Sequence, residues 1–259
     1  MQESPPEKTP SRLQTVERAV AFLEYVAAHE LPTVRDVAVG LTLNLTTAYH
    51  LFNTLHYLGY LDRDADLRLR IGSRVSALNQ AYSRGISLNR ELVAIVEDLS
   101  KSTGETASAS LLVGDSVVIQ ALSEGHQPVR AAGLYVGLSG SEHLRASGRL
   151  VLAFADPTRR SRILESALRN VTQEERVQIE SRLNREAHVI RERGWSLDDG
   201  SYQPDISGVS APILDSSNVV VGTINVSTPS SRFAQRQADV VAATVASAER
   251  ATLLYSQGR

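Results

Sequence analysis

Three successive helical patterns occupy residues 15–59, and they restrict the fold of this 259-residue chain more than any other feature. The apolar residues of the first pattern recur at the spacing of one helix face and are Val16, Ala19, Val20, Leu23, Val26 and Ala27. Thr15 is the expected N-cap of this helix. After a break at residues 29–32, Thr33 and Asp36 form a T-x-x-D variant of the capping box, which predicts that a second, short helix begins there.

The third pattern lies in the stretch TTAYHLFNTLHYLGYLDR, residues 46–63, after a turn of three or four residues. Its apolar members are expected to face the two earlier helices and are Ala48, Leu51, Phe52, Leu55 and Leu58. Gly59 is expected to end the helix. The opposite face is almost wholly uncharged but rich in hydrogen-bonding groups, and it consists of Thr46, Thr47, Tyr49, His50, Asn53, Thr54, His56 and Tyr57.

Two short alternating runs, residues 60–63 and 67–71, follow this helix and are joined by Asp64-Ala65-Asp66. Alternation around a short polar turn predicts a small hairpin. Three helices followed by a hairpin make a winged helix-turn-helix, in which the second helix of the motif enters the major groove of DNA.

Side chains near the start of the third helix are therefore expected to meet base edges, and these are Thr46, Thr47, Tyr49, His50 and Asn53. Asn can pair with adenine and Thr can touch a thymine methyl, so charge is not required for base recognition. Phosphate contacts supply most of the affinity, and the candidates for them are Arg35, Arg63, Arg68 and Arg70. The alternative is that the helix face is merely solvated and that the hairpin arginines only keep the hairpin soluble.

Net charge gives no support to nucleic-acid binding, because the whole chain carries −2 at pH 7. In the first 74 residues, eight Lys and Arg are balanced by nine Asp and Glu. Any affinity for DNA therefore has to come from where the arginines are placed, and from two copies acting together in a dimer.

The rest of the chain mixes helical and strand patterns. Helices are expected at residues 73–83, 88–102, 146–155, 157–169, 172–193 and 234–255. Strands are expected at residues 107–113, 116–122, 129–132, 195–197, 208–214 and 219–227. Thr172 with Glu175 forms a second capping box, Gly194 ends the helix that follows it, and Gly114-Asp115 favours a two-residue hairpin. The last helix is expected to bury Ala234, Ala238, Val241, Val245 and Ala248.

These patterns predict an α+β protein of two domains. Residues 1–11 hold three of the nine prolines and are expected to form a flexible tail. Residues 12–72 are the expected DNA-binding domain, residues 73–86 a linker helix, and residues 87–259 a larger domain with a sheet and flanking helices.

In these motifs the chain resembles the IclR family of bacterial transcriptional regulators. The resemblance extends from Thr15 to Tyr255 and rests on TVERAVAFLEYVA, TTAYHLFNTLHYLGYL, RDADLRLRIG, GETASASLLVGDSVV, SEHLRASGRLVLA, GWSLDDG, SAPILD and NVSTPSSRF, in that order. It implies a winged helix-turn-helix, a linker helix and a C-terminal effector-binding domain of GAF-like fold with an antiparallel sheet. It also implies a homodimer or dimer of dimers that acts on palindromic operator DNA. The family commonly has an arginine where this chain has His50.

The resemblance places a small-molecule effector between the sheet and the helix after the glycine-rich segment 133–140. The lining that it implies is Val129, Ala132, Arg145, Ala146, Ser147, Asp198, Gly208, Asn225 and Ser227. Arg145 stands where the family usually has a small or hydroxyl residue, and it can either clamp an acidic ligand or point to solvent. His143 is as well suited to a structural hydrogen bond as to a ligand contact, and Trp195 is expected in the core. A small organic acid or aromatic acid is the expected effector.

Other function classes have little support in the sequence. Cysteine is absent, so disulfides and thiolate metal sites are excluded. The chain has no stretch typical of a signal peptide or a membrane span, so a cytoplasmic protein that does not bind membranes is expected. Nucleophile-elbow, zinc-protease and phosphate-loop motifs are missing, no cofactor is expected, and Asp198-Asp199 before Gly200 is interpreted as a turn.

The expected function is that of a ligand-responsive, sequence-specific DNA-binding regulator and not an enzyme. The alternatives are a small-molecule sensor that has lost DNA binding and acts through protein contacts, and an enzyme.

Overall fold

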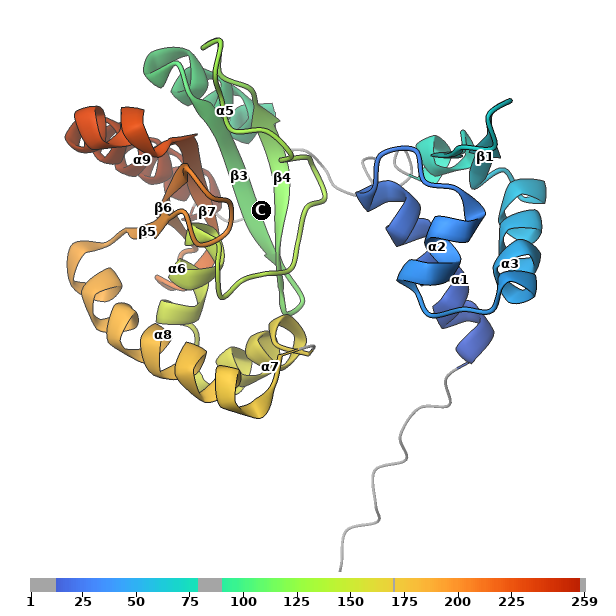
Figure 1. The fold of residues 1–259 in the computed structure, drawn as a ribbon. Helices are drawn as coiled ribbons and strands as arrows, with labels where there is room; N and C mark the ends of the chain where they lie inside the picture. The colour runs from blue at the N-terminus through green and yellow to red at the C-terminus, as the bar shows by residue number, and fades with distance from the viewer. Residues whose placement is uncertain (1–12, 79–89, 170, 257–259) are drawn as a thin grey trace, which may run out of the picture. The chain divides into compact units, whose positions relative to one another are not determined.

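The computed structural model describes residues 13–78, 90–169 and 171–256. The chain divides into two compact units, Met1–Ser87 and Leu88–Arg259 (Figure 1). The predicted tail and most of the predicted linker helix lie outside the described residues, and residues 74–78 are helical. No helix of the described residues is long and apolar enough to cross a membrane.

Within residues 13–78, three helices are followed by a two-stranded hairpin. The elements are α1 (Gln14–Ala28), α2 (Val34–Gly40), α3 (Leu45–Tyr57), β1 (Leu61–Arg63) and β2 (Leu69–Ile71). The antiparallel hairpin pairs Leu61 with Ile71 and Arg63 with Leu69. A winged helix-turn-helix is therefore present, with Gly59 at φ +77° ending α3 as expected.

Local sequence determines most of the helix ends in this unit. The capping box of α2 is formed, since the Thr33 hydroxyl accepts from the Asp36 N–H and the Asp36 carboxylate accepts from the Thr33 N–H at 2.8 Å. The expected cap of α1 is wrong, because Leu13 occupies the N-cap and Thr15 lies inside the helix. The cap of α3 is Asn44, whose side chain accepts from the Thr47 N–H at 2.7 Å.

The core of this unit confirms most of the expected face of α3 but not that of α1, where Phe22 and Val26 are buried while Val16, Val20 and Ala27 are exposed. Its buried members are Phe22, Val26, Val34, Val37, Ala38, Ala48, Leu51, Phe52, Leu55, Leu61 and Leu69. Leu58 was expected among them but is 50% exposed, because the chain leaves the helix at that residue.

Within residues 90–169 and 171–256, five strands form one antiparallel sheet of order β4-β3-β7-β6-β5. The strands are β3 (Thr106–Val113), β4 (Ser116–Ser123), β5 (Ser196–Asp199), β6 (Ile206–Leu214) and β7 (Val220–Pro229). The helices are α5 (Arg90–Thr103), α6 (Ala146–Phe154), α7 (Pro157–Ala167), α8 (Gln173–Arg193) and α9 (Ser230–Ser256). Both the Gly114-Asp115 hairpin and the Thr172–Glu175 capping box are formed as predicted.

The two faces of the sheet differ in polarity. Helices α5 and α9 pack on one face, against alternate apolar residues of the strands such as Ala107, Ala109 and Val209 (Figure 1). Helix α6 covers part of the other face and is backed by α8. Because successive strand residues point to opposite faces, Ser108 and Ser110 lie on this second face, which holds the cavity described below.

Two expectations about this unit are wrong, the second only in part. Residues 129–132 form no strand and belong to a long connection between β4 and α6. The expected buried face of α9 is only partly correct: Ala248 is buried and Val241 and Val245 pack against the core, but Ala234 and Ala238 are exposed, and Val240, Thr244 and Ala251 are buried instead. Arg236 has non-helical φ and ψ (−128° and 20°), which shifts the helix register after it. Trp195 is only partly buried and packs at the edge of the core.

Candidate functional site

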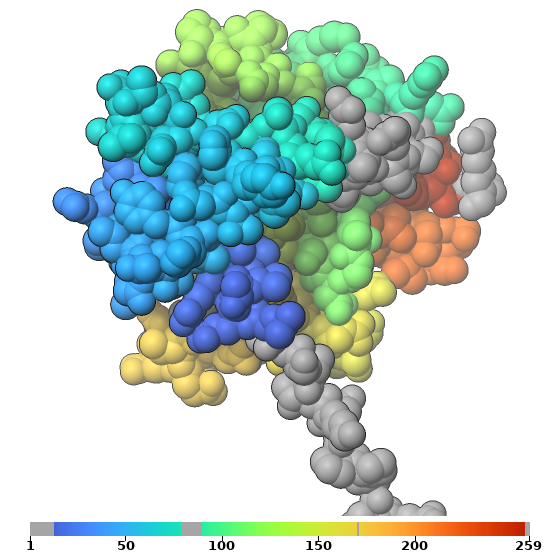
Figure 2. Space-filling model, turned by 90° about the vertical axis from the view of Figure 1, so that its right-hand side faces the viewer, coloured from blue at the N-terminus to red at the C-terminus, as the bar shows by residue number. Residues whose placement is uncertain are grey.

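The polar face of α3 is open to solvent. Thr46, His50 and Asn53 are exposed, Tyr49 is 42% exposed, and Thr47 is half-buried. Within the part of the chain that the structure describes, none of these five side chains forms a hydrogen bond. Figure 2 turns this face toward the viewer, on the blue-to-cyan surface of the unit.

The C-terminal half of the same face is already occupied by internal contacts. The Thr54 hydroxyl donates to the carbonyl of His50 at 2.9 Å. The His56 ring stacks on Phe52 and hydrogen-bonds the carbonyl of Leu61 at 2.9 Å. The polar side chains between Thr46 and Asn53 therefore remain without internal hydrogen bonds, and they lie toward the helix start, the part that meets base edges in a major groove.

The hairpin arginines are held by neighbouring groups to different extents. The Arg63 guanidinium lies 5.0 Å from the centre of the Phe52 ring, and Arg68 Nη1 donates to a backbone carbonyl at 3.3 Å. These contacts leave both positive charges unneutralised. Arg70 differs, because its Nη2 lies 2.8 Å from Asp64 Oδ2 in an ion pair. Arg35 on α2 is exposed.

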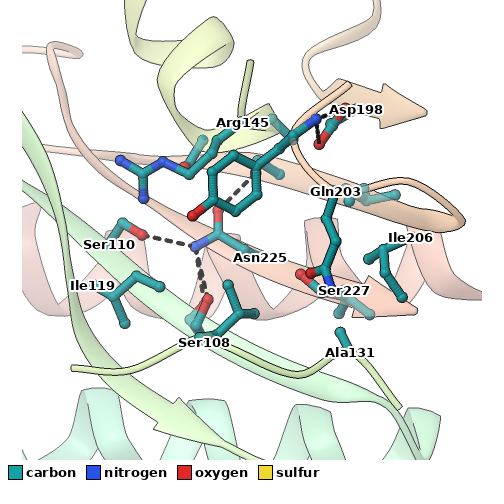
Figure 3. Close-up of a pocket in the computed structure, with 18 residues that line it drawn as sticks. Ser108, Ser110, Ile119, Ala131, Arg145, Asp198, Gln203, Ile206, Asn225 and Ser227 are labelled. Atoms are coloured by element: carbon teal, nitrogen blue, oxygen red, sulfur yellow. Dashed lines mark hydrogen bonds between the residues drawn. The ribbon is translucent and has the colours of Figure 1, made fainter. Parts of the chain in front are cut away.

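A cavity of about 50 Å³ lies against the polar face of the C-terminal sheet (Figure 3). Strands β3, β6 and β7 form its floor, and the start of α6 and residues 198–206 form its rim. The floor is hydrophilic because small polar residues of the strands face the cavity. Apolar side chains form part of the cavity wall, namely those of Ile119, Ala131 and Leu134.

Asn225 is the centre of the floor. Across the strands it stands directly opposite Ser108 on one side and Ser210 on the other. Its Nδ2 donates to Ser110 Oγ at 3.1 Å and to Ser108 Oγ at 3.2 Å, and its Oδ1 accepts from Ser210 Oγ at 2.7 Å. Because the two β3 hydroxyl oxygens act as acceptors here, their own protons are available to a bound molecule.

Arg145 is buried at the rim and does not point to solvent, since it is only 6% exposed. Its Nη2 donates to the carbonyl of Val117 at 2.7 Å and lies 3.7 Å from Glu142 Oε1. Its Nε is buried without a hydrogen-bond partner among the described residues. Burial lowers the pKa of the Arg145 guanidinium, and the charge of Glu142 opposes that shift.

Helix α6 begins directly after Arg145, and Arg145 gives it no side-chain cap. Ala146 and Ser147 at this start line the same cavity as Arg145, and the first backbone N–H groups of a helix have no partner within it. Free N–H groups at a helix start favour negative charge. Together with the serine hydroxyls, they make a donor-rich surface that suits an anion rich in hydrogen-bond acceptors.

Asp198 is 5% exposed and is engaged by the chain that follows it. Its Oδ1 accepts from the N–H groups of Ser201 at 2.7 Å and Tyr202 at 3.3 Å. Burial raises the pKa of this carboxyl, and these hydrogen bonds and the charge of Arg149 oppose the shift. These contacts agree with the interpretation of Asp198-Asp199 as the start of a turn. No cluster of three or more His, Asp or Glu residues in the described ranges is arranged to hold a metal ion.

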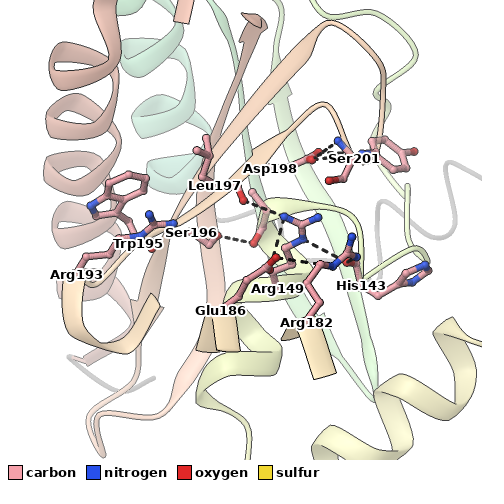
Figure 4. Close-up of polar contacts among 12 residues, drawn as sticks. His143, Arg149, Arg182, Glu186, Arg193, Trp195, Ser196, Leu197, Asp198 and Ser201 are labelled. Carbon is pink, nitrogen blue, oxygen red and sulfur yellow. Dashed lines mark hydrogen bonds and ion pairs between the residues drawn. The ribbon is translucent and has the colours of Figure 1, made fainter. Parts of the chain in front are cut away.

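A buried polar cluster lies behind the cavity and joins α6, α8 and β5 (Figure 4). Arg149, 6% exposed, donates from Nε to the carbonyl of His143 at 3.2 Å and from Nη1 to the carbonyl of Leu197 at 3.1 Å. Its Nη1 also lies 3.7 Å from Glu186 Oε2. The His143 ring is outside the cavity lining, and burial lowers its pKa. This cluster fixes α6 relative to the strand that carries Asp198.

Comparisons with known proteins agree with this architecture. Residues 15–65 match the IclR helix-turn-helix domain, and residues 80–252 match the model described as "Bacterial transcriptional regulator IclR C-terminal". The chain belongs to the IclR family of bacterial transcriptional regulators.

Individual relatives of this IclR-family chain cover most of its length. It is 29% identical to the glycerol operon regulatory protein of Streptomyces griseus, over 85% of this chain and 87% of that protein. It is 25% identical to the transcriptional regulator BhcR of Paracoccus denitrificans, over 92% and 85%. A crystal structure of an IclR homologue from Microbacterium hydrocarbonoxydans complexed with 4-hydroxybenzoate has the same fold, with a TM-score of 0.66, 21% identity, and coverage of 93% and 100%.

As an IclR-family regulator, the protein has an N-terminal helix-turn-helix DNA-binding domain and a C-terminal effector-binding domain. Seven of the nine residues expected around the effector line the cavity, namely Arg145, Ala146, Ser147, Asp198, Gly208, Asn225 and Ser227. Val129 and Ala132 do not, since both are exposed on the loop that replaces the expected strand, and Ala131 lines the cavity instead.

The sequence expectations missed several lining residues. Ser108 and Ser110 were identifiable from the alternation in TASAS, once that face of β3 is known to meet the cavity. Tyr202, Gln203 and Ile206 had no local signal, because they belong to a connection whose path depends on the rest of the fold.

Proposed function

We propose that the protein binds palindromic operator DNA as a homodimer or dimer of dimers, with α3 of each copy in a major groove. Thr46, Thr47, Tyr49, His50 and Asn53 are assigned to base edges. The observation that carries this proposal is the exposed face of five polar side chains at the start of α3, which have no internal hydrogen bonds in the described chain. A capped helix start held by a packed core is a suitable support for such contacts.

Arg35, Arg63 and Arg68 are assigned to phosphates, with Arg70 as a weaker contributor because Asp64 neutralises it. Their charges supply affinity that does not depend on sequence. In a dimer the two reading helices would lie about 34 Å apart, one turn of duplex. Such a regulator would act in the cytoplasm, where its operator lies.

We further propose that a small organic acid occupies the C-terminal cavity and changes the affinity for DNA. Arg145, the start of α6 and the serine hydroxyls form a surface rich in hydrogen-bond donors, which supports an anionic ligand. The 4-hydroxybenzoate complex of the Microbacterium homologue is consistent with an acid as effector. Differential binding worth about 1–3 kcal/mol between two states of the protein is enough for regulation.

A footprinting experiment tests the regulator. Purified protein is titrated onto DNA from upstream of its own and neighbouring genes, with and without a panel of organic acids. Protection of two half-sites related by a two-fold axis, shifted in concentration by at least one acid, is expected. If no fragment is protected at any concentration while an acid still binds the protein, the sensor that acts through protein contacts replaces this proposal.

A further inference from the structure

A short connection between β5 and β6, residues 200–205, borders the cavity and places Tyr202 and Gln203 in its lining. Its two ends are fixed. Gly200 (φ +77°) donates its N–H to the carbonyl of Ile206 at 3.1 Å. The carbonyl of Asp205 (φ +62°) accepts from the N–H of Ser230 at 2.8 Å.

The Asp198 carboxylate holds the first half of this connection. Its Oδ1 accepts the N–H groups of both Ser201 and Tyr202, and its Oδ2 lies 3.3 Å from the Tyr202 nitrogen. These bonds occupy acceptor positions of a carboxylate that is 5% exposed. Asp198 therefore acts on the cavity mainly through Tyr202, which it positions.

Tyr202 stands close to the charged end of the cavity. Both Tyr202 and Arg145 line the cavity, and Tyr202 is half-buried there. Gly208 also lines the cavity, and its Cα hydrogens face the Cβ atoms of Ala146 and Asp198, which a Cβ at this position would meet at an ordinary contact distance of 3.7 Å. The space between Arg145 and the sheet floor is thus bounded by an aromatic side chain on one wall.

The volume left inside is small for an aromatic ligand. About 50 Å³ is available, and about three to five water molecules fill such a volume when each needs about 10–15 Å³. A short acid such as acetate suits this space, whereas a cavity known to hold benzene measures about 150 Å³, so a benzoate ring does not fit unless a wall residue moves.

We infer that Tyr202, positioned by Asp198, is a specificity-determining residue that limits the cavity to short-chain acids and excludes aromatic ones. The inference rests on the proposed acid effector and adds its size class. Removing the phenol ring, without touching Arg145 or the start of α6, should enlarge the cavity while leaving the anion-binding groups in place.

The test is isothermal titration calorimetry of the full-length protein with acetate, pyruvate, benzoate and 4-hydroxybenzoate. The wild type is expected to bind at least one of the two short acids and to bind benzoate at least about tenfold more weakly, a discrimination typical of steric limits in pockets. Tyr202→Ala should remove most of this difference by gaining at least about tenfold for benzoate. Tyr202→Phe retains the ring and should keep the wild-type order.

Two substitutions of Asp198 separate its role in positioning Tyr202 from a general loss of folding. Asp198→Asn keeps an oxygen that can accept the two N–H groups and should retain the size limit, whereas Asp198→Ala should relax it toward the Tyr202→Ala profile. Tyr135→Ala is the matched control, because this tyrosine is 59% exposed and lies outside the cavity lining. Circular dichroism and thermal unfolding establish that each variant is folded, and the Tyr202→Phe comparison still decides the question if Asp198→Ala is not.

The outcomes are distinguishable. If short acids bind and their affinity relative to benzoate is the same in wild type and Tyr202→Ala, the inference about Tyr202 is overturned while the acid effector stands. If the wild type prefers benzoate, the size limit is overturned in the same way. If no acid binds any of the folded proteins, the acid effector itself is wrong and the inference falls with it.

Discussion

The guanidinium of Arg145 donates a hydrogen bond of 2.7 Å to the backbone carbonyl of Val117. Val117 belongs to β4, the edge strand of the sheet, and its N–H lies 3.3 Å from Glu142 Oε1. The next bonds along this edge are made with Gly137 and Leu138 by the backbone of Ile119. Arg145 thus satisfies a backbone carbonyl at the edge of the sheet, and it also lines the cavity with its Nε unpartnered among the described residues.

Arg145→Met should weaken the binding of short acids by at least about tenfold, because it removes a charged donor whose hydrogen bonds are worth about 1.5–3 kcal/mol. Loss of the bond to Val117 should also lower the thermal unfolding temperature of the C-terminal domain. Binding of operator DNA without acid should not change. Calorimetry with acetate and pyruvate, together with a gel-shift titration, measures the two effects.

The matched control is Arg130→Met, which makes the same chemical change on the exposed loop. Arg130 is paired with Glu124 at 2.9 Å and lies outside the cavity lining. This variant should keep wild-type affinity for both acids. Equal losses in the two variants would mean that Arg145 acts only through net charge.

Thr33→Ala should destabilise the DNA-binding domain by about 1 kcal/mol, because it removes the hydroxyl that caps α2. Thr15→Ala is the matched control. Thr15 lies inside α1 and caps nothing, so alanine should leave stability unchanged or slightly higher because of its greater helix propensity. Urea unfolding followed by circular dichroism measures the free energy of unfolding of both variants. An equal loss of stability in both would mean that Thr15 does cap α1.

Features encoded by neighbouring residues could be predicted from the sequence. The capping boxes at Thr33 and Thr172 each need only a hydroxyl and a carboxylate three residues apart, and both are formed. The buried face of α3 follows from apolar spacing, because this helix packs on one side only. Spacing did not predict the face of α1, which buries Phe22 and leaves Val16 and Val20 exposed.

Features that depend on residues far apart in the sequence could not be predicted from local patterns. The expected strand at residues 129–132 has the right composition but no partner to pair with, because Gly137 and Leu138 take the hydrogen bonds of Ile119 instead. The face of α9 shifts at Arg236, whose Nη1 is bound to the carbonyl of Thr103, more than a hundred residues away in sequence. The role of Asp198 depends on the path of the chain after it, which no local pattern determines.

Asn53→Ala and His50→Ala should reduce the preference for operator over unrelated DNA, since each base contact is worth about 1–3 kcal/mol of discrimination. Arg68→Ala should instead weaken binding to all sequences and lower the slope of log affinity against log salt by about one. Fluorescence anisotropy on operator and scrambled duplexes at several salt concentrations separates the two behaviours.

Arg70→Ala serves as the control for charge placement within the hairpin. Because Asp64 already neutralises Arg70, its loss should change the salt slope less than the loss of Arg68. If all four variants gave the same loss on both duplexes, the division between base-contacting and phosphate-contacting residues would be wrong.

Two carboxyls of the C-terminal domain should respond to pH with opposite signs. Burial raises the folded-state pKa of Asp198. Ionisation of Asp198 therefore costs stability, and this cost appears as the pH rises from the usual Asp range through the folded pKa. Hydrogen bonds from the Arg159 and Thr158 N–H groups lower the pKa of Asp156, the exposed N-cap of α7, so its stabilisation is present above the usual Asp pKa and is lost as pH falls.

Asp198→Asn keeps an acceptor for the Ser201 and Tyr202 N–H groups and removes the charge. Its stability relative to wild type should therefore be lowest near pH 4, rise with pH, and level off above the folded pKa of Asp198. Asp156→Asn retains a good N-cap, and its stability relative to wild type should instead rise as the pH falls below the usual Asp pKa and be level above about pH 5. Urea unfolding of the C-terminal domain between about pH 3 and 8 measures both differences. A flat Asp198→Asn difference across this range would mean that burial does not disfavour the ionised carboxyl, because the bonds to the connection after β5 and the charge of Arg149 then compensate for the loss of water.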